Sequence, residues 1–197
     1  MSTLSSLLRR KHVTLAEVGA HLDALSEKAR VAQTRALGAR LQAKLFDLAR
    51  GERPLTLEDL TPGARPLQGV THEGRNSLPA FRYFAKVFCR PDDGRAERWG
   101  YNRTPGLVHG TVGPGFFVAV PHGPAEVLID YTLTPPRKPA DWPDIAHKYS
   151  KLSRFVYYGT QDVLRGVSQH VSIGRAKRGG RWMNNWFILC RVEKEPR

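Results

Sequence analysis

Residues 163–192 read VLRGVSQHVSIGRAKRGGRWMNNWFILCRV, and this stretch decides the fold. Two runs rich in β-branched and aromatic residues, 163–176 and 181–192, flank the sequence KRGG at 177–180. A tight two-residue turn needs positive φ angles, which a Gly-Gly pair supplies without steric cost. The stretch therefore predicts an antiparallel hairpin of two long strands.

Shorter strand-like runs precede this hairpin. Apolar and polar residues alternate over 81–90, a turn-forming PDDG sequence follows at 91–94, and a partner strand is expected over 98–103. Further strands are expected at 116–120, 125–133 and 155–158. The chain shows no strand-helix-strand alternation, which argues against a parallel sheet. Several antiparallel strands after a helical segment predict an α+β fold whose sheet closes, or nearly closes, into a small barrel.

The first part of the chain is predicted to be helical. Thr14 and Glu17 form a capping box, and apolar residues recur with helical spacing from Leu15 to Leu48. The pattern predicts one very long helix, or two helices joined near Gly38. The apolar stripe is expected to pack on the sheet, and the alternative is a homodimer through the N-terminal helices. The expected organisation is a helical segment, 1–53, and a barrel-like domain, 54–197.

Composition indicates a globular protein with a basic excess. The chain has 197 residues, 41% of them hydrophobic, and a formal net charge of +13. Such a charge attracts polyanions, anionic membrane surfaces or acidic ligands. No apolar run of about 18 residues is present, so no transmembrane segment is predicted, and the cytoplasm is the expected location. Cys89 and Cys190 lie in apolar runs and are expected to be reduced core residues.

Small residues gather on one face of the first long predicted strand. This face comprises Gly166, Ser168, His170, Ser172 and Gly174, and it leaves room for a ligand or for close approach of a helix. The leading hypothesis is a small-molecule-binding protein whose barrel holds an apolar, lipid-like ligand that can also carry an anionic group. The candidate ligand-binding residues are Asp130, Tyr131, Tyr158, Arg165, Ser168, His170, Trp182, Asn185 and Trp186.

An enzyme built on the same pocket is the first alternative. His170 would act as general acid or base, with Asp130 or Tyr158 orienting it. The histidines and cysteines lack the spacing of a metal site, so no metal is predicted. The sequence GTVGPG at 110–115 superficially resembles a phosphate-binding loop, but Pro114 removes a donor and no Lys-Ser/Thr follows. The sequence does not identify a cofactor.

A nucleic-acid or anionic-surface binding protein is the second alternative. Cations and phenyl rings interleave on one face of the 81–90 strand, a pattern that single-stranded nucleic acids use. The competing interpretation is a partly exposed strand whose Phe residues pack under the helices. The candidate residues on this strand and at the tip of the last hairpin are Arg82, Lys86, Arg90, Arg175, Lys177, Arg178 and Arg181.

The sequence YYGTQDVLRGV at 157–167, followed by VSIGR at 171–175, resembles the last hairpin of lipocalin-like, calycin-type barrels that bind lipids or haem. In those barrels an aspartate, a hydrophobe and an arginine lead into a strand that ends in a hydrophobe-glycine pair. The resemblance covers the C-terminal strands and does not extend to a Gly-x-Trp signature near the first strand. It implies a barrel with an interior ligand site.

Overall fold

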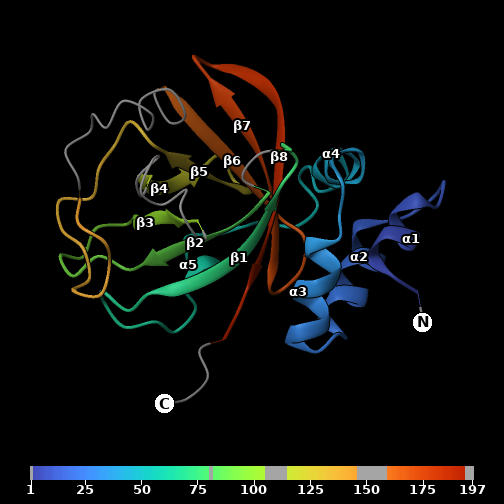
Figure 1. Cartoon of the computed structure of the whole chain (residues 1–197), viewed down its shortest axis with the longest axis horizontal. Coiled ribbons are helices and arrows are strands. Elements are labelled where there is room, and N and C mark those ends of the chain that lie inside the picture. The colour runs from blue at the N-terminus through green and yellow to red at the C-terminus, as the bar shows by residue number, and fades with distance from the viewer. Residues whose placement is uncertain (1, 80–81, 105–114, 146–158, 194–197) are drawn as a thin grey trace.

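The computed structural model describes residues 2–79, 82–104, 115–145 and 159–193, and it consists of helices followed by a β-barrel (Figure 1). The helices are α1 (Leu4–Arg9), α2 (Leu15–Asp23), α3 (Glu27–Arg35), α4 (Ala39–Leu48) and α5 (Leu57–Leu60). The strands are β1 (Val70–Asn76), β2 (Tyr83–Cys89), β3 (Arg98–Arg103), β4 (Phe116–His122), β5 (Glu126–Asp130), β6 (Thr160–Gly166), β7 (Val171–Arg178) and β8 (Arg181–Arg191). The predicted α+β fold with a closed barrel is confirmed.

The eight strands form a closed antiparallel meander in which each strand pairs with the next and β8 returns to β1. The 177–180 turn joins β7 to β8 as predicted, and both glycines have positive φ, 55° at Gly179 and 77° at Gly180. Closure leaves no long sheet edge unpaired. Since side chains alternate across each strand, closure also assigns every strand residue to the interior or the outside.

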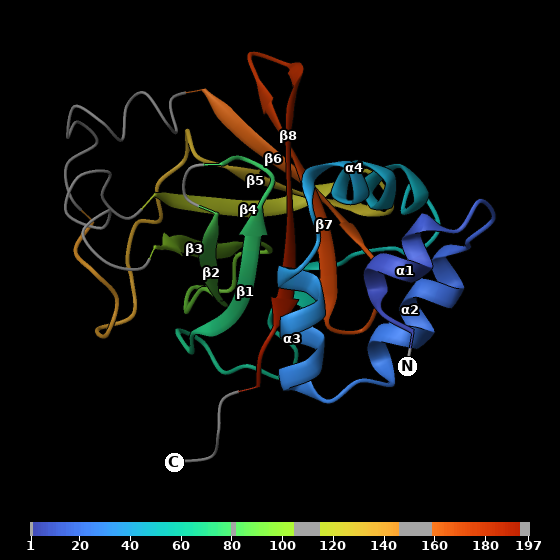
Figure 2. The ribbon, with the colours of Figure 1, turned by 45° about the vertical axis from the view of Figure 1, so that its right-hand side comes forward.

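The barrel carries different coverings on its two sides (Figure 2). Helices α1–α4 pack their apolar residues against Val171, Ile173 and Ile188 on the outside of β7 and β8. Trp142, in the segment after β5, covers the outside of β2–β4. The interior forms a third apolar cluster, which includes Phe84, Phe88, Phe117, Leu164, Phe187 and Leu189. The apolar stripe of the helices thus faces the barrel, and a homodimer through these helices stays a prediction, as does division of the chain at residue 53.

Two predicted elements are wrong in their extent. The helical stretch over 15–48 is three helices. The break near Gly38, one of the two alternatives, is present, with Gly38 as the N-cap of α4, but a second break precedes α3, which Ser26 caps. The predicted strand over 163–176 is two strands, β6 and β7, joined by a turn over 167–170. Alternation of apolar residues continues through this turn, so the pattern alone did not reveal it.

The small residues predicted to leave an open space are instead covered by rings of the barrel itself. A Cβ atom added at Gly174 would lie 2.2 Å from the Phe187 ring and 2.8 Å from a methyl of Leu164. A Cβ atom added at Gly100 would likewise lie 2.3 Å from the Phe117 ring. These glycines let phenyl rings cross the interior, and the space above β7 is filled at Gly174.

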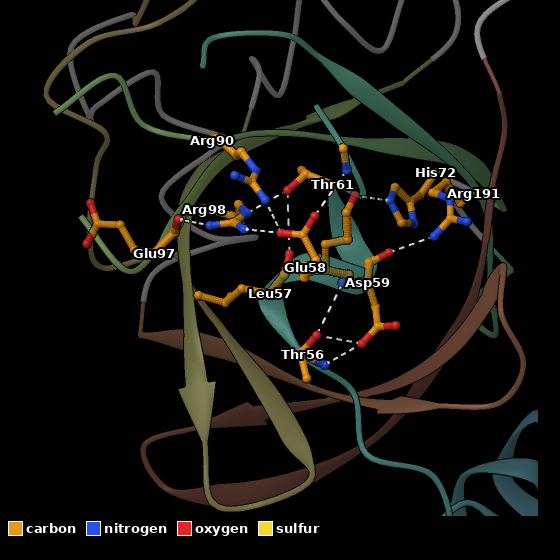
Figure 3. A network of polar contacts seen from close by, with 12 residues as sticks. Thr56, Leu57, Glu58, Asp59, Thr61, His72, Arg90, Glu97, Arg98 and Arg191 are labelled. Atoms are coloured by element: carbon orange, nitrogen blue, oxygen red, sulfur yellow. Dashed lines mark hydrogen bonds and ion pairs between the residues drawn. The ribbon is translucent and has the colours of Figure 1, made fainter. Parts of the chain in front are cut away.

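Helix α5 plugs one end of the barrel (Figure 3). Thr56 and Asp59 form its capping box. Glu58 accepts a hydrogen bond from the Gly63 amide at 3.0 Å and forms ion pairs with Arg90 and Arg98. The backbone hydrogen bond is the largest cause of the lowered pKa of Glu58, to which both arginines also contribute. The plug is therefore held by charged groups as well as by Leu60, which packs into the interior.

Two strand residues hold the plug's carbonyl groups. Arg191 donates to the Asp59 carbonyl at 2.8 Å, and Nε2 of His72 donates to the Leu60 carbonyl at 2.9 Å (Figure 3). Burial lowers the pKa of His72 to about 4, and the nearby Arg191 charge acts in the same direction. His72 is thus neutral at pH 7 and serves the plug as a hydrogen-bond donor.

Cys89 and Cys190 are free and buried, as predicted, and burial raises the pKa of each thiol to about 12. No helix in the described part of the chain has both the length and the apolar character needed to span a bilayer.

Gly174→Ala is expected to lower the free energy of unfolding by about 1–3 kcal/mol, because the added methyl collides with the Phe187 ring. Ser172→Ala, two residues earlier on the same face, is the matched control: its buried hydroxyl has no hydrogen-bond partner, so its loss should be nearly neutral. Urea denaturation measures both. Equal stability of the two variants would mean that the interior at Gly174 is not filled as described.

The stability of the plugged end should fall in mild acid. Between pH 6.5 and 4 the unfolded chain protonates His72 while the folded chain does not, so the free energy of unfolding should drop by about 3 kcal/mol. His72→Gln, which keeps a donor for the Leu60 carbonyl, should flatten this dependence. His12→Gln, at an exposed position, is the control and should retain it. Urea titrations across this pH range provide the measurement, and an unchanged slope in His72→Gln would contradict the assignment.

Candidate functional site

A buried lysine is the most unusual residue of the interior. Lys86 lies in the middle of β2, between Phe84 and Phe88 on the same inward face, and it is only 2% exposed. Buried lysines are rare unless they are paired. Its neighbours therefore define the candidate site.

The Lys86 ammonium has three polar partners from three other strands or strand ends. Its Nζ donates to Oδ1 of Asn102 at 2.9 Å and to Oη of Tyr131, and it lies 3.2 Å from Oδ2 of Asp162. The Tyr131 hydroxyl donates to the same Asp162 oxygen at 2.9 Å and accepts from Nδ2 of Asn102 at 3.2 Å. We call Lys86, Asn102, Tyr131 and Asp162 the Lys86 site.

Aromatic rings surround this polar group. The Lys86 Nζ lies 5.0 Å from the ring centroids of Phe117, Tyr131 and Phe187, and 5.6 Å from that of Phe84. At these distances the negative faces of the rings can stabilise a cation. The ammonium is thus held by one carboxylate, two neutral acceptors and four rings.

Two opposing effects act on the protonation of Lys86. Burial lowers its pKa, and this is the larger effect, because desolvation disfavours the charged amine. The Asp162 charge and hydrogen bond act in the opposite direction. The pKa of Lys86 is therefore below that of an exposed lysine, and its amine is easier to deprotonate.

The Lys86 site lies toward the end of the barrel opposite the plug. Thr160 and Asn185, which follow on the same inward faces toward this end, are also polar, and Asn185 accepts from the Ser77 hydroxyl at 3.3 Å. Toward α5, the interior is occupied by Phe88, Leu164 and Leu189. The interior is thus polar at the Lys86 end, and an apolar layer separates this site from the polar groups that hold the plug.

The residues predicted to bind a ligand are dispersed. Tyr131 and Asn185 face the interior, and Tyr131 belongs to the Lys86 site. Arg165 lies outside, where it bonds Glu126 at 2.7 Å and the Phe46 carbonyl of α4 at 2.8 Å. Four more predicted residues occupy the outer face or the turn over 167–170, and these are Asp130, Trp182, Trp186 and Ser168. Tyr158 lies outside the described residues.

His170 lies in the turn over 167–170, at the plugged end. Its Nδ1 accepts from Arg191 at 3.1 Å, and burial is the main cause of its lowered pKa. A hollow beside it, also lined by Asp59, His72 and Ser172, has a volume of about 10 Å³, enough for about one water molecule. Asp130 ends β5 at the opposite end of the barrel. The structure therefore does not bring His170 together with Asp130, nor with residues 182–186.

The cations of the 81–90 strand do not form one surface. Arg82 is exposed, Lys86 is inside the barrel, and Arg90 pairs with Glu58 of the plug. The interpretation of a continuous basic and aromatic outer face is wrong, because closure of the barrel turns Phe84, Lys86 and Phe88 inward. The hairpin residues Arg175, Lys177, Arg178 and Arg181 do lie together on β7 and β8.

Sequence reasoning missed Asn102 and Asp162 and placed Lys86 on a surface. One signal was present: Phe84 and Phe88 flank Lys86 on one face of a strand whose other face carries Ala85, Val87 and Cys89. A strand that is apolar on both faces is buried on both, and its lysine needs an internal partner. Nothing local in the sequence points to Asp162 as that partner.

Family models, curated proteins and solved structures gave no match to this chain. The fold and the Lys86 site therefore define it as an α+β protein with a plugged eight-stranded antiparallel barrel and a buried ion pair inside.

Breaking the buried pair should destabilise the protein, whereas replacing both partners should not. Asp162→Asn leaves Lys86 without its counter-charge, and we expect a loss of about 3–5 kcal/mol in the free energy of unfolding. The double variant Lys86→Met with Asp162→Leu should lie within about 1 kcal/mol of the wild type. Urea denaturation of both variants checks this. A double variant as unstable as Asp162→Asn would show that the fold itself requires the ion pair.

Proposed function

We propose that the barrel binds a small, mostly apolar molecule at the polar end of its interior, and that the Lys86 site receives the polar group of that molecule. A closed β-barrel is consistent with ligand binding, since eight strands enclose a space that side chains can fill or that can hold one small ligand. The resemblance of the C-terminal strands to calycin-type barrels supports the same function.

The observation that carries the proposal is a complete ion pair inside the barrel, at the end away from the plug. A buried ion pair is weak evidence for a stabilising role, because apolar side chains of similar size often give equal or greater stability. Ligand sites, in contrast, typically combine an apolar and aromatic lining with a few fixed polar or charged groups, as the Lys86 site does. Tyr131, which is only partly buried, connects the pair with the outer end of the interior.

The charges favour an uncharged polar group on the ligand. Lys86 and Asp162 neutralise each other, so a carboxylate would meet the Asp162 charge as well as the ammonium. A carbonyl or ester oxygen could accept from Lys86 or from Tyr131 without that repulsion. We therefore infer a lipid-like ester, ketone or aldehyde in preference to an anion. The enzyme hypothesis based on His170 gains no support from the geometry, because Asp130 lies at the other end of the barrel.

Binding can be measured with two probes of equal chain length, methyl dodecanoate and dodecanoate. The wild type should bind the ester more tightly than the acid, as judged by native mass spectrometry and by the rise in melting temperature. The double variant Lys86→Met with Asp162→Leu should bind the ester at least about tenfold more weakly, the effect of one hydrogen bond to a charged group.

The matched control is Ser172→Ala, a substitution inside the barrel near the plug, which should bind the ester as the wild type does. Lack of binding of either probe by the wild type would contradict the proposal. If the wild type and the double variant bound the ester with equal affinity, the ligand would have to bind somewhere other than the Lys86 site.

A further inference from the structure

The outer end of the β7–β8 hairpin concentrates positive charge. Arg175, Lys177, Arg178 and Arg181 lie within seven consecutive residues that contain no acid. Arg178 and Arg181 are exposed on either side of the Gly179-Gly180 turn. No ion pair joins Arg175, Lys177 or Arg181 to an acid in the part of the chain that the structure describes. In this respect the hairpin end differs from the plug, where Glu58 forms ion pairs with Arg90 and Arg98.

Tryptophan rings hold two of these cations in place. The Arg175 guanidinium lies 5.1 Å from the Trp182 ring and 4.9 Å from the Trp186 ring, and Lys177 Nζ lies 4.2 Å from Trp182. The Arg175 Nε donates to the Met183 carbonyl at 2.9 Å, which fixes the guanidinium further. Cations restrained by rings lose little side-chain freedom when they bind an anion.

Trp182, whose ring contacts both Arg175 and Lys177, packs against a helix and is still partly exposed to solvent. Trp182 packs edge-on against Phe46 of α4, with ring centroids 5.7 Å apart and an interplanar angle of 71°, yet it is 42% exposed. The hairpin extends beyond the rest of the barrel in both views (Figures 1 and 2). The cations and the exposed ring are therefore accessible to a large partner.

We propose that the outer end of the β7–β8 hairpin binds single-stranded nucleic acid, with Trp182 contacting a base and three cations contacting phosphates. Arg175 and Lys177 lie on the same face as Trp182, and Arg181 lies beside the turn. Interleaved cations and aromatic rings suit a single strand, whose bases are free to contact rings, better than a duplex, whose bases are stacked inside. An anionic membrane fits less well, because the turn 178–181 reads RGGR and Trp182 is the one large apolar side chain that the described hairpin exposes beside it. This surface is separate from the Lys86 site and does not depend on the function proposed for it.

The test is fluorescence anisotropy of a labelled oligothymidylate titrated with the full chain at several salt concentrations. With these three cations engaged, the logarithm of the association constant should fall with the logarithm of salt concentration with a slope of about −2, from ~0.7 per phosphate contact. Lys177→Glu with Arg181→Glu should lower the affinity at least about tenfold at low salt and make the slope shallower by about 1.4.

The matched control is Lys11→Glu with Lys28→Glu, which changes the net charge equally at two exposed positions on the helical side of the molecule. It should retain most of the affinity and the full slope. Should the glutamate pair on the hairpin fail to fold, Lys177→Gln with Arg181→Gln replaces it, with the same expected direction.

Three results would overturn the proposal. The first is no binding by the wild type even at low salt. The second is an equal loss of affinity in the hairpin variant and the control variant, which would assign binding to net charge alone. The third is tighter binding of a duplex, or of vesicles containing phosphatidylserine, than of the single strand.

Discussion

The pairing of β1 with β8 is the interaction on which the rest of the structure depends, because it closes the meander of strands into a barrel. Closure gives every strand an inside and an outside, and it turns Lys86 and Asp162 toward each other across the interior. Neither charge could be tolerated there alone, because an unpaired buried charge is costly. The ion pair is therefore a consequence of closure, and a barrel lacking one partner would hold an uncompensated charge.

The two ends of the barrel differ in the way that their polar groups are used. At the plugged end, Arg98, Arg191 and His72 are committed to side chains and carbonyls of the segment containing α5, so they serve the structure (Figure 3). At the other end, the partners that the described residues offer to the Lys86–Asp162 pair are side chains that project inward from strands or strand ends. A ligand could exchange with partners of that kind without unfolding an element. This difference is the physical reason for placing the proposed ligand site at the Lys86 end.

Much of the fold could be predicted from the sequence, but less of the site. The Gly179-Gly180 turn fixed the last hairpin, and the absence of strand-helix-strand alternation favoured an antiparallel barrel. The turn over 167–170 was missed because its residues continue the alternation of the flanking strands. The site was missed because Lys86 and Asp162 meet only after closure, and alternation gives the face of a residue without saying which face becomes the interior. The small-residue face was seen, yet Phe187 fills the space at Gly174.

The central claim is that the Lys86 amine lies inside the barrel and contacts the polar group of a bound molecule. Nitrogen-15 NMR of the lysine side chains, followed through a pH titration with and without methyl dodecanoate, tests this claim directly. The account predicts a slowly exchanging lysine signal with a pKa below the usual lysine value, absent in Lys86→Met and shifted on adding the ester. A spectrum in which every lysine titrates as an exposed amine, with no response to the ester, would contradict it.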